Sequence, residues 1–239
     1  KSDAPATLLR MGVTFHFNTW ADADAVTALK PDVVIIATGG FPHTEVLKAG
    51  NDLVVSSWDI ISGDVKPGTN VLIFDDAGDH AALQAADMIA KSGARVEIMT
   101  PDRTFSPEVM AMNLVPYMRT LQKLNTVFTV TYDLEKVERD GNRLKCTVGS
   151  HYGGVHQERL VDQVVVNHGT MPLDELYFEL KPHSSNLGAV DYEAFIAGRA
   201  QKVRSNPEGT FQLFRIGDAV EARNTHAAIY DALRLAKDL

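Results

Sequence analysis

Apolar residues in this chain occur in short runs that end at a glycine, which predicts buried strands. The pattern D-x-V-[VI]-[VI]-x-x-G-x-x-P occurs twice, at residues 32–42 and at residues 162–172. An uninterrupted β-branched run suits a strand of a parallel sheet that is covered on both faces. The glycine allows a backbone or a ligand to come close, and the proline fixes the turn that follows. The repetition indicates two related domains of the nucleotide-binding type.

Further segments of regular periodicity alternate between strand and helix. Strands are expected at residues 13–17, 52–56, 70–75, 95–100, 159–167 and 211–216. Helices are expected at residues 1–9, 21–29, 58–61, 80–92, 106–124, 191–197 and 226–237. Ser106 and Pro107 are typical of the N-cap and first position of a helix, and Pro116 predicts a bend within it. The alternation predicts an α/β fold with mainly parallel sheets.

Residues 127–160 differ from the rest of the chain because they alternate as strands without intervening helices. Residues 127–132, 134–139 and 143–148 alternate apolar with polar positions, and Asp-Gly-Asn at residues 140–142 predicts a hairpin turn. We expect an antiparallel crossover there. The loop of residues 62–68, which contains glycine, proline and serine, is the best linker candidate.

Composition narrows the classes of function. The 239 residues fit one large or two ordinary domains, and the net charge of -8 argues against a nucleic-acid partner. The single cysteine, Cys146, excludes an internal disulfide and a four-cysteine cluster within this chain, and the histidines lack metal-ligand spacing. No apolar run approaches the ~20 residues of a membrane span, and no signal peptide is recognised. A cytoplasmic protein without a membrane partner is the expectation.

The turn after the strand at residues 70–75 decides whether a dinucleotide can bind. A functional turn carries G-x-G-x-x-G, whose glycines let pyrophosphate approach a helix N-terminus. Here the three glycine positions are Asp75, Ala77 and His80, and Asp76 and Asp79 add negative charge. We therefore expect no NAD(P) site. The alternative is that Gly78 only shifts the turn and that binding survives.

A second candidate site lies near the C-terminus. Residues 211–220, which contain Gly217 and Asp218, are followed by a predicted helix that begins near His226. This segment resembles the second flavin motif of flavoproteins that have two dinucleotide domains. Residues 37–40, Ala-Thr-Gly-Gly, resemble the ATG strand end of those proteins, and residues 166–172 resemble their G-x-x-P strand end. The alternative is a strand end and a helix cap without a ligand.

Nearly the whole chain resembles the C-terminal third of the trimethylamine dehydrogenase, histamine dehydrogenase and dimethylglycine-type N-demethylase group. The residues that carry this resemblance lie at 56–60, 71–76, 173–178 and 226–234. The 2,4-dienoyl-CoA reductases are more distant relatives. The resemblance implies two Rossmann-like domains. Residues 1–64 and 160–239 would form an FAD/ADP-type domain that lacks its first G-x-G-x-x-G turn, and residues 65–159 would form an inserted NAD(P)-type domain.

The resemblance also implies cofactors, partners and site residues. FAD or ADP would bind in the first domain, at Thr38, Gly39, Gly40, Gly217, Asp218 and His226. FMN and a 4Fe-4S centre would belong to a missing N-terminal part that contains a TIM barrel. Electrons would pass to a protein acceptor such as an electron-transferring flavoprotein, and the full-length enzyme would be a homo-oligomer. No catalytic residue and no metal ligand are assigned to this chain.

Three functions remain open at this point. The first is part of an amine dehydrogenase or N-demethylase, in which this fragment is itself inactive. The second is an NAD(P)H-dependent module similar to 2,4-dienoyl-CoA reductase, which would need an intact glycine turn. The third is a non-catalytic interaction domain with a nucleotide-binding fold.

Overall fold

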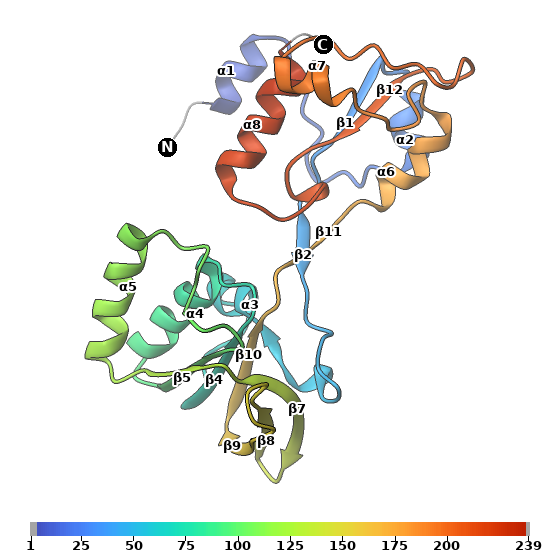
Figure 1. Ribbon diagram of the computed structural model, residues 1–239. Coiled ribbons are helices and arrows are strands. Elements are labelled where there is room, and N and C mark those ends of the chain that lie inside the picture. Colours follow the sequence, from blue (N-terminus) through green and yellow to red (C-terminus); the bar gives the residue numbers. More distant parts are fainter. Residues whose placement is uncertain (1–3, 238–239) are drawn as a thin grey trace. The chain divides into compact units, whose positions relative to one another are not determined.

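The computed structural model describes residues 4–237, which divide into two compact units (Figure 1). Among these residues, the first unit consists of residues 4–38, 174–220 and 224–237, and the second consists of residues 39–173 and 221–223. Both units combine helices with parallel strands. The structure therefore confirms the predicted α/β class.

The second unit is built on a five-stranded parallel sheet. Its order is β3 (Val55–Ser56), β10 (Gln163–Asn167), β4 (Asn70–Asp75), β5 (Arg95–Thr100) and β6 (Val127–Val130). Strand β4 lies at the centre, and its chain neighbours β5 and β6 extend the sheet to one side while β10 and β3 lie on the other. The pattern of uninterrupted apolar residues in β4 and β10 follows from this central position.

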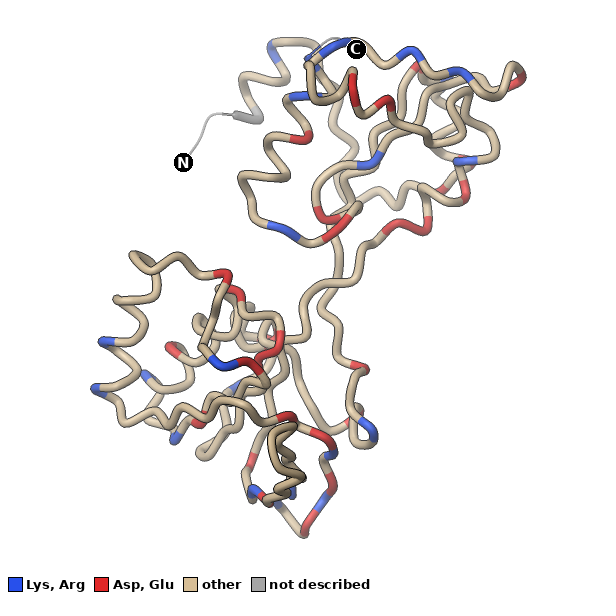
Figure 2. The backbone as a smooth tube through the Cα atoms, in the orientation of Figure 1, with Lys and Arg blue, Asp and Glu red and all other residues tan. Residues whose placement is uncertain are grey.

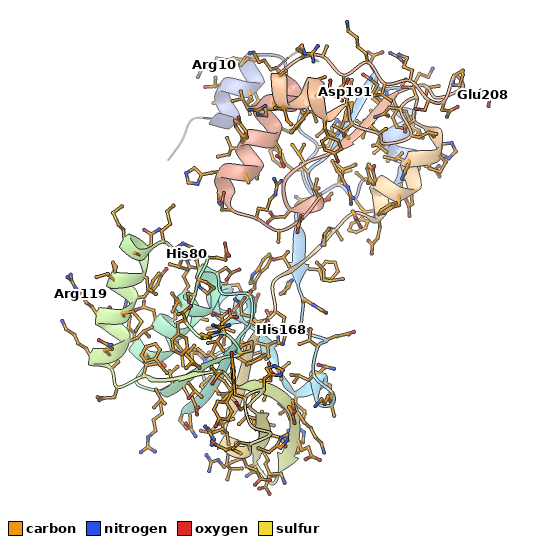
Figure 3. The ribbon with its side chains drawn as sticks, in the orientation of Figure 1. Arg10, His80, Arg119, His168, Asp191 and Glu208 are labelled. Atoms are coloured by element: carbon orange, nitrogen blue, oxygen red, sulfur yellow. The ribbon has the colours of Figure 1, made fainter. Side chains whose placement is uncertain are left out.

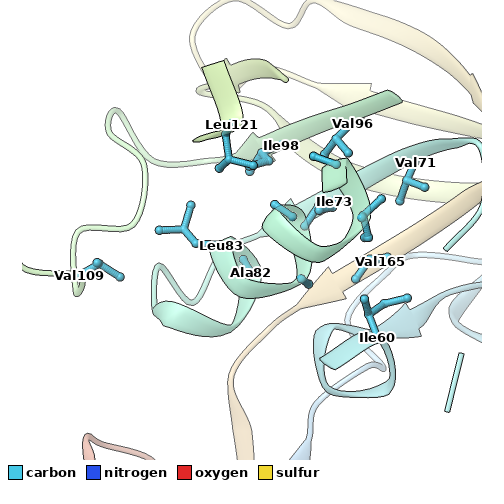
Figure 4. Packing of buried hydrophobic residues seen from close by; sticks show 14 residues of the cluster. Ile60, Val71, Ile73, Ala82, Leu83, Val96, Ile98, Val109, Leu121 and Val165 are labelled. Atoms are coloured by element: carbon cyan, nitrogen blue, oxygen red, sulfur yellow. The ribbon is translucent and has the colours of Figure 1, made fainter. Parts of the chain in front are cut away.

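Alternate residues of these strands enter two different cores. Val71 and Ile73 of β4 pack toward α3 (Ser57–Ser62), α4 (His80–Lys91) and α5 (Ala111–Lys123), in the cluster drawn in Figure 4. Leu72 and Phe74 pack in a second cluster with residues of an antiparallel sheet. Successive side chains of a strand point to opposite faces of the sheet. A strand that is covered on both faces is therefore apolar at every position and does not alternate between apolar and polar residues.

The antiparallel sheet consists of β7 (Asp133–Asp140), β8 (Arg143–Gly149) and β9 (His156–Val161). The predicted hairpin turn is confirmed, since Asp140 pairs with Arg143 and Gly141 has φ +59°. Cys146 of β8 is fully buried, and burial raises the pKa of its thiol to about 12. The cysteine is therefore an inert core residue.

A short antiparallel ribbon pairs β2 (Gly40–Pro42) with β11 (Thr170–Pro172). The two G-x-x-P repeats recognised in the sequence supply these paired strands. A 3-10 turn, η1 (Asn51–Leu53), precedes β3. The expected strand at residues 52–56 thus begins within this turn, and only Val55–Ser56 pairs with the sheet.

The first unit contains a two-stranded parallel sheet of β1 (Val33–Ile36) and β12 (Gln212–Arg215). Its core joins both strands to α2 (Ala23–Ala28) and α6 (Glu175–Leu180) through buried residues such as Leu180 and Leu213. The other elements are α1 (Ala4–Arg10), η2 (Lys181–His183), α7 (Tyr192–Ala197), η3 (Gly217–Ala219) and α8 (Thr225–Ala236). The predicted helix at residues 1–9 begins outside the described residues.

The helix expected from Ser106 begins later, at Ala111. Ser106 has φ +48°, a left-handed conformation that an N-cap does not adopt, and the backbone N–H of Glu108 donates to the carbonyl of Gly78. Residues 106–109 therefore form a turn against the β4–α4 connection. Pro116 does lie inside the helix, as the sequence predicted.

Three other expectations about strands were wrong. Residues 13–17 form no strand. Residues 127–130 belong to the parallel sheet as β6 and are not part of the antiparallel crossover. The run at residues 159–167 divides at Asp162, because β9 pairs with β8 whereas β10 pairs with β4. The backbone N–H of Asp162 donates to the carbonyl of Asn70 at this division.

The units also divide at residues different from the expected domain boundaries of 64/65 and 159/160. The chain passes between units at 38/39 and 173/174, and the short segment of residues 221–223 also groups with the second unit. Residues 39–64 lie in the second unit because β3 pairs with β10 and α3 packs against α4. The loop at residues 62–68 is consequently a connection inside one unit, where the backbone N–H of Gly68 donates to Gln163 Oε1.

Candidate functional site

The turn between β4 and α4 lies where α/β sheets bind ligands. It follows the carboxyl end of β4, and the sheet extends in opposite directions from the junction of β4 and β10. Ligands of open α/β sheets bind outside the carboxyl ends of strands at such a switch point. Asp75 and Asn167 end the two strands and are register partners. The side chains of these two residues therefore meet at this point.

Buried polar side chains fill the turn from inside. Asn167 Nδ2 lies 2.9 Å from Asp75 Oδ1 and 2.9 Å from Asp79 Oδ1 and donates to both. Asn167 Oδ1 accepts from the hydroxyl of Ser57 at 3.0 Å. Asp75, Asn167 and Ser57 are each less than 5% exposed. One asparagine thus links the end of β4, the start of α4 and the start of α3.

Four backbone N–H groups of the turn have partners within the protein. Those of Asp76 and Ala77 donate to the carbonyl of Asn167, each at 3.2 Å. The N–H of Gly78 donates to Asp75 Oδ1 at 2.9 Å, and that of Ala81 donates to Asp79 Oδ1 at 2.8 Å. These are the kinds of donor that hold a phosphate at the start of a helix. Here carboxylate and carbonyl oxygens occupy them.

Pro107 covers the same turn. Gly78 has φ +68°, and a Cβ at that position would lie 2.6 Å from Pro107 Cδ. The glycine is thus explained by its backbone conformation and by close packing, without any ligand. The turn of residues 106–109, described above, is what brings the proline to this place.

Burial makes Asp75 a weak acid. The pKa of Asp75 rises from its ordinary 3.8 to about 6, mainly by desolvation, and hydrogen bonds from Asn167 and Gly78 oppose the rise. The nearby carboxylates of Asp79 and Asp76 add to it. Asp75 Oδ2 is buried and has no hydrogen-bond partner in the part of the chain that the structure describes. The interior of the turn disfavours negative charge.

Acidic residues also surround the outer side of the turn. Asp76 Oδ1 lies 2.8 Å from Nδ1 of His168, whose side chain is 1% exposed. His80 and His168 are labelled in Figure 3, at the start of α4 and just beyond the end of β10. A pocket of about 270 Å³ lies beside Asp76. Asp133 and Glu135 of β7 also line it, together with His151 and Lys48, which pair with these two carboxylates. Figure 2 marks such acidic positions in red.

Several features of this turn oppose the approach of a pyrophosphate. Pyrophosphate needs free N–H donors, room above a glycine turn and neutral or positive surroundings. The described residues offer donors that are already bonded, a proline over the turn and several carboxylates.

The Gly217–Asp218 turn of the first unit follows a similar strand end. Ile36 of β1 pairs with Arg215 of β12, and the N–H of Ile216 donates to the carbonyl of Ile36 at 3.0 Å. Thr38 and Gly217 each follow one of these paired strands by two residues. Both predicted residues therefore lie at the carboxyl end of the same sheet, where a ligand of an α/β fold is expected.

Gly217 is held against α8. It has φ +60°, its N–H lies 3.3 Å from Asp231 Oδ2, and a Cβ added there would lie 3.3 Å from the Cβ of Ala228. Asp218 lies in η3 and is partly buried, whereas His226 is exposed in the first turn of α8. The structure thus gathers Gly217 and Asp218 beside α8, and His226 belongs to the same helix.

Gly39 and Gly40 belong to the second unit. Gly39 has φ +74°, and a Cβ at Gly40 would lie 2.4 Å from the carbonyl oxygen of Met171 in β11. The backbone of the ribbon therefore explains why glycine stands at both positions: Gly39 has a positive φ, and Gly40 lies too close to Met171 for a side chain. Of the six residues that the sequence suggested, the first unit contains Thr38, Gly217, Asp218 and His226.

Three residues of the β4–α4 turn were not predicted from the sequence: Asn167, Ser57 and Pro107. A signal for Asn167 was present, because it ends the second buried strand as Asp75 ends β4, and parallel strands bring such residues together. Pro107 gave the opposite signal, since it was assigned to a helix start. Ser57 gave no signal of its own.

Within residues 4–237, no group of histidine, cysteine or carboxylate side chains is arranged to hold a metal ion. Among the helices that the structure describes, none has the length and apolar character needed to cross a membrane.

Comparison with known proteins gives close relatives but no family model, since none of the protein-family models matches the chain. The chain is 74% identical over 230 residues to a "Probable N-methylproline demethylase" of Rhizobium meliloti (strain 1021), covering 96% of this chain and 34% of that protein. It is 43% identical over 242 residues to an "N,N-dimethylglycine/sarcosine dehydrogenase" of Chromohalobacter salexigens, covering 97% of this chain and 35% of that protein.

Among solved structures, the chain is similar to a 2-naphthoyl-CoA reductase complex, with a TM-score of 0.75 and 25% sequence identity. The match covers 98% of this chain and 31% of the reductase chain. The chain spans about a third of the length of each of these proteins. It is therefore related, over nearly its whole length, to one part of a group of oxidoreductases that includes demethylases and amine dehydrogenases, as its sequence motifs predicted.

Proposed function

We propose that this chain is the nucleotide-domain region of a flavin and iron–sulfur oxidoreductase that oxidises N-methylated amines. In this proposal the whole protein passes electrons from FMN through a 4Fe-4S centre to a protein acceptor, such as an electron-transferring flavoprotein. Both cofactors belong to an N-terminal part with a TIM barrel, and this chain itself performs no catalytic step. The whole protein is proposed to be a cytoplasmic homo-oligomer.

The closed β4–α4 turn is the observation that carries this proposal. Hydride exchange with NAD(P) needs a pyrophosphate-binding turn, and here Asn167, Asp75 and Asp79 occupy its donors. Electrons would then have to leave by another route. The two relatives with the highest identity quoted above are named a demethylase and a dehydrogenase of methylated amines, which supports an amine as the electron donor.

The first unit is proposed to bind FAD or ADP. Thr38, Gly217, Asp218 and His226 would contribute one half of the site from the carboxyl end of the β1–β12 sheet and from α8. Gly39 and Gly40, which the sequence also suggested, lie in the second unit and are left out of this proposed set. The other half would be the glycine-rich turn that the resemblance implies and that this chain lacks. Asp218 would accept hydrogen bonds from hydroxyl groups of the ligand.

Turnover of the whole protein with different acceptors tests this proposal. With N-methylproline or N,N-dimethylglycine as the electron donor, reduction of a one-electron dye such as ferrocenium should proceed, and reduction of NAD⁺ or NADP⁺ should not. Amine-dependent formation of NADH or NADPH would contradict the proposal. No turnover of any methylated amine, with active flavin present, would contradict the substrate class.

A second candidate is a reductase that uses NAD(P)H. The match to a 2-naphthoyl-CoA reductase favours it, because that protein shares the fold over 98% of this chain. The two candidates separate on the β4–α4 turn, since the reductase needs a dinucleotide there. Flavin reduction by NADPH in the whole protein would favour this candidate over the amine dehydrogenase.

A third alternative, a non-catalytic interaction domain, would be favoured if neither an amine nor NADPH reduces the protein.

A further inference from the structure

We infer that Asn167 is a specificity-determining residue that closes the β4–α4 turn to phosphate from inside. This inference rests on the proposed function in one respect, namely that the turn occupies the place of a dinucleotide site. It goes further by separating two barriers to the binding of phosphate at this turn. One is repulsion by the aspartates, and the other is occupation of the donors by a network that Asn167 holds together.

Asn167 takes part in five hydrogen bonds at this point. Its carbonyl accepts from the N–H groups of Asp76 and Ala77, its Nδ2 donates to Asp75 and Asp79, and its Oδ1 accepts from Ser57. Asn167 is buried, with 4% of its surface exposed. Every hydrogen-bonding group that the side chain presents to the turn is therefore used inside the protein.

The orientation of the amide is fixed by its neighbours. The two aspartate oxygens can only accept when they are ionised, so they require the Nδ2 side of the amide. The hydroxyl of Ser57 donates to the Oδ1 side at 3.0 Å. A rotation of the amide by half a turn would set oxygen against both carboxylates. This arrangement explains why an amide, and not a carboxylate or an aliphatic side chain, stands at position 167.

The amide also holds the aspartates in the positions that block phosphate. Asp75 Oδ1 accepts from both Asn167 and Gly78, and Asp79 Oδ1 accepts from both Asn167 and Ala81. Each carboxylate oxygen thus lies where it satisfies a turn N–H, as a phosphate oxygen would. Neutralising the aspartates without removing their side chains would leave this occupation unchanged, because an asparagine oxygen accepts in the same way.

Two sets of substitutions in the whole protein distinguish occupation from charge. The neutral variant carries Asp75→Asn and Asp79→Asn, which remove both charges and retain the acceptors. The opened variant carries Asp75→Gly, Asp79→Gly and Asn167→Ala, which also remove the side chains that accept from the N–H groups of Gly78 and Ala81. Hydrogen–deuterium exchange of residues 75–81 is measured with and without an excess of inorganic pyrophosphate, so the readout is local to this turn.

The inference predicts that pyrophosphate slows exchange of residues 75–81 in the opened variant alone, by about tenfold at a concentration about ten times the Kd. Protection of the neutral variant would overturn it, because charge would then be the barrier. An opened variant that folds and gains no protection would also overturn it. Protection of the unsubstituted protein would instead contradict the proposed function, since the turn would already bind phosphate.

Asn167→Ala alone gives a test that does not depend on gaining a ligand. Exchange of the amides of Gly78 and Ala81 should accelerate by about tenfold or more, as loss of about 1.4 kcal/mol of local stability implies. Asn70→Ala, at the amino end of the neighbouring strand β4, is the matched control, because Asn70 Nδ2 bonds only to the carbonyl of Leu160 among the contacts described. Equal exchange at residues 75–81 in both variants would overturn the inference.

Discussion

Asn167 and Asp75 end two neighbouring parallel strands of the second unit, and Nδ2 of the asparagine lies 2.9 Å from Oδ1 of the aspartate. This contact lies at the point of the sheet where an α/β fold holds a ligand. The same asparagine reaches Asp79 at the start of α4. A turn that would be open in a dinucleotide-binding domain is therefore filled by the protein itself.

Replacing Asp75 with asparagine should stabilise the protein at neutral pH. The folded-state pKa of about 6 exceeds the ordinary 3.8, so the contribution of Asp75 to stability is fully present below pH 3.8 and is lost as the pH rises through 6. The loss is on the order of 3 kcal/mol. Asparagine cannot ionise and still accepts from Gly78.

The measurement for this prediction is urea unfolding of both proteins at several pH values. The difference in the free energy of unfolding should grow from near zero at pH 4 to its full value at pH 7.5. A difference that does not change between these pH values would refute the role assigned to burial of Asp75.

Gly78→Ala should destabilise the second unit more than Gly93→Ala does. Both glycines have positive φ, but a Cβ at position 78 would lie 2.6 Å from Pro107 Cδ, whereas a Cβ at position 93 meets nothing within 4 Å. The backbone cost is about 1 kcal/mol for each, and the overlap adds about 1–3 kcal/mol at position 78.

A double-mutant cycle with Pro107→Ala isolates the overlap. Alanine at 107 lacks Cδ, so Gly78→Ala should then cost about as much as Gly93→Ala. An unchanged cost of Gly78→Ala in the two backgrounds would show that Pro107 does not cover the turn.

Asp218→Ala should weaken the binding of ADP to the whole protein. A hydrogen bond between the carboxylate and a ligand hydroxyl contributes about 1.5–3 kcal/mol, which corresponds to roughly a tenfold or greater increase in Kd. Glu208→Ala, in an exposed loop of the same unit, is the control and should leave Kd unchanged. An equal Kd for both variants and the unsubstituted protein would remove Asp218 from the proposed site.

Cys146 should resist thiol reagents in the folded protein. Its side chain is buried and its pKa is raised to about 12, so very little thiolate exists at pH 8. Reaction with a chromogenic disulfide should be slow in buffer and fast in guanidinium chloride. Rapid reaction without denaturant would indicate that β8 opens or is not packed as described.

The sequence was sufficient for elements that carry a strong local pattern. The strand expected at residues 70–75 is β4, and the helix expected at residues 80–92 matches α4 except at its last residue. The two apolar runs were correctly read as buried strands, although β1 is covered on fewer sides than expected, since Ile35 is 36% exposed. Local preferences and tertiary packing agree in these segments.

The remaining features depend on contacts between distant residues. Pro107 signals a helix start locally, but its packing against Gly78 fixes a turn there. The division between units could not be read from the loop at residues 62–68, because pairing of β3 with β10 decides it. The role of Asn167 requires knowing that β10 is the neighbour of β4, which periodicity alone does not give.

Calorimetric titration of the whole protein with NADH, NADPH and ADP tests the central claim most directly. The account predicts binding of ADP and no binding of either nicotinamide dinucleotide at the β4–α4 turn, with exchange of residues 75–81 unchanged in their presence. Micromolar binding of NADH or NADPH that protects residues 75–81 would contradict it, because those residues would then form a working dinucleotide site.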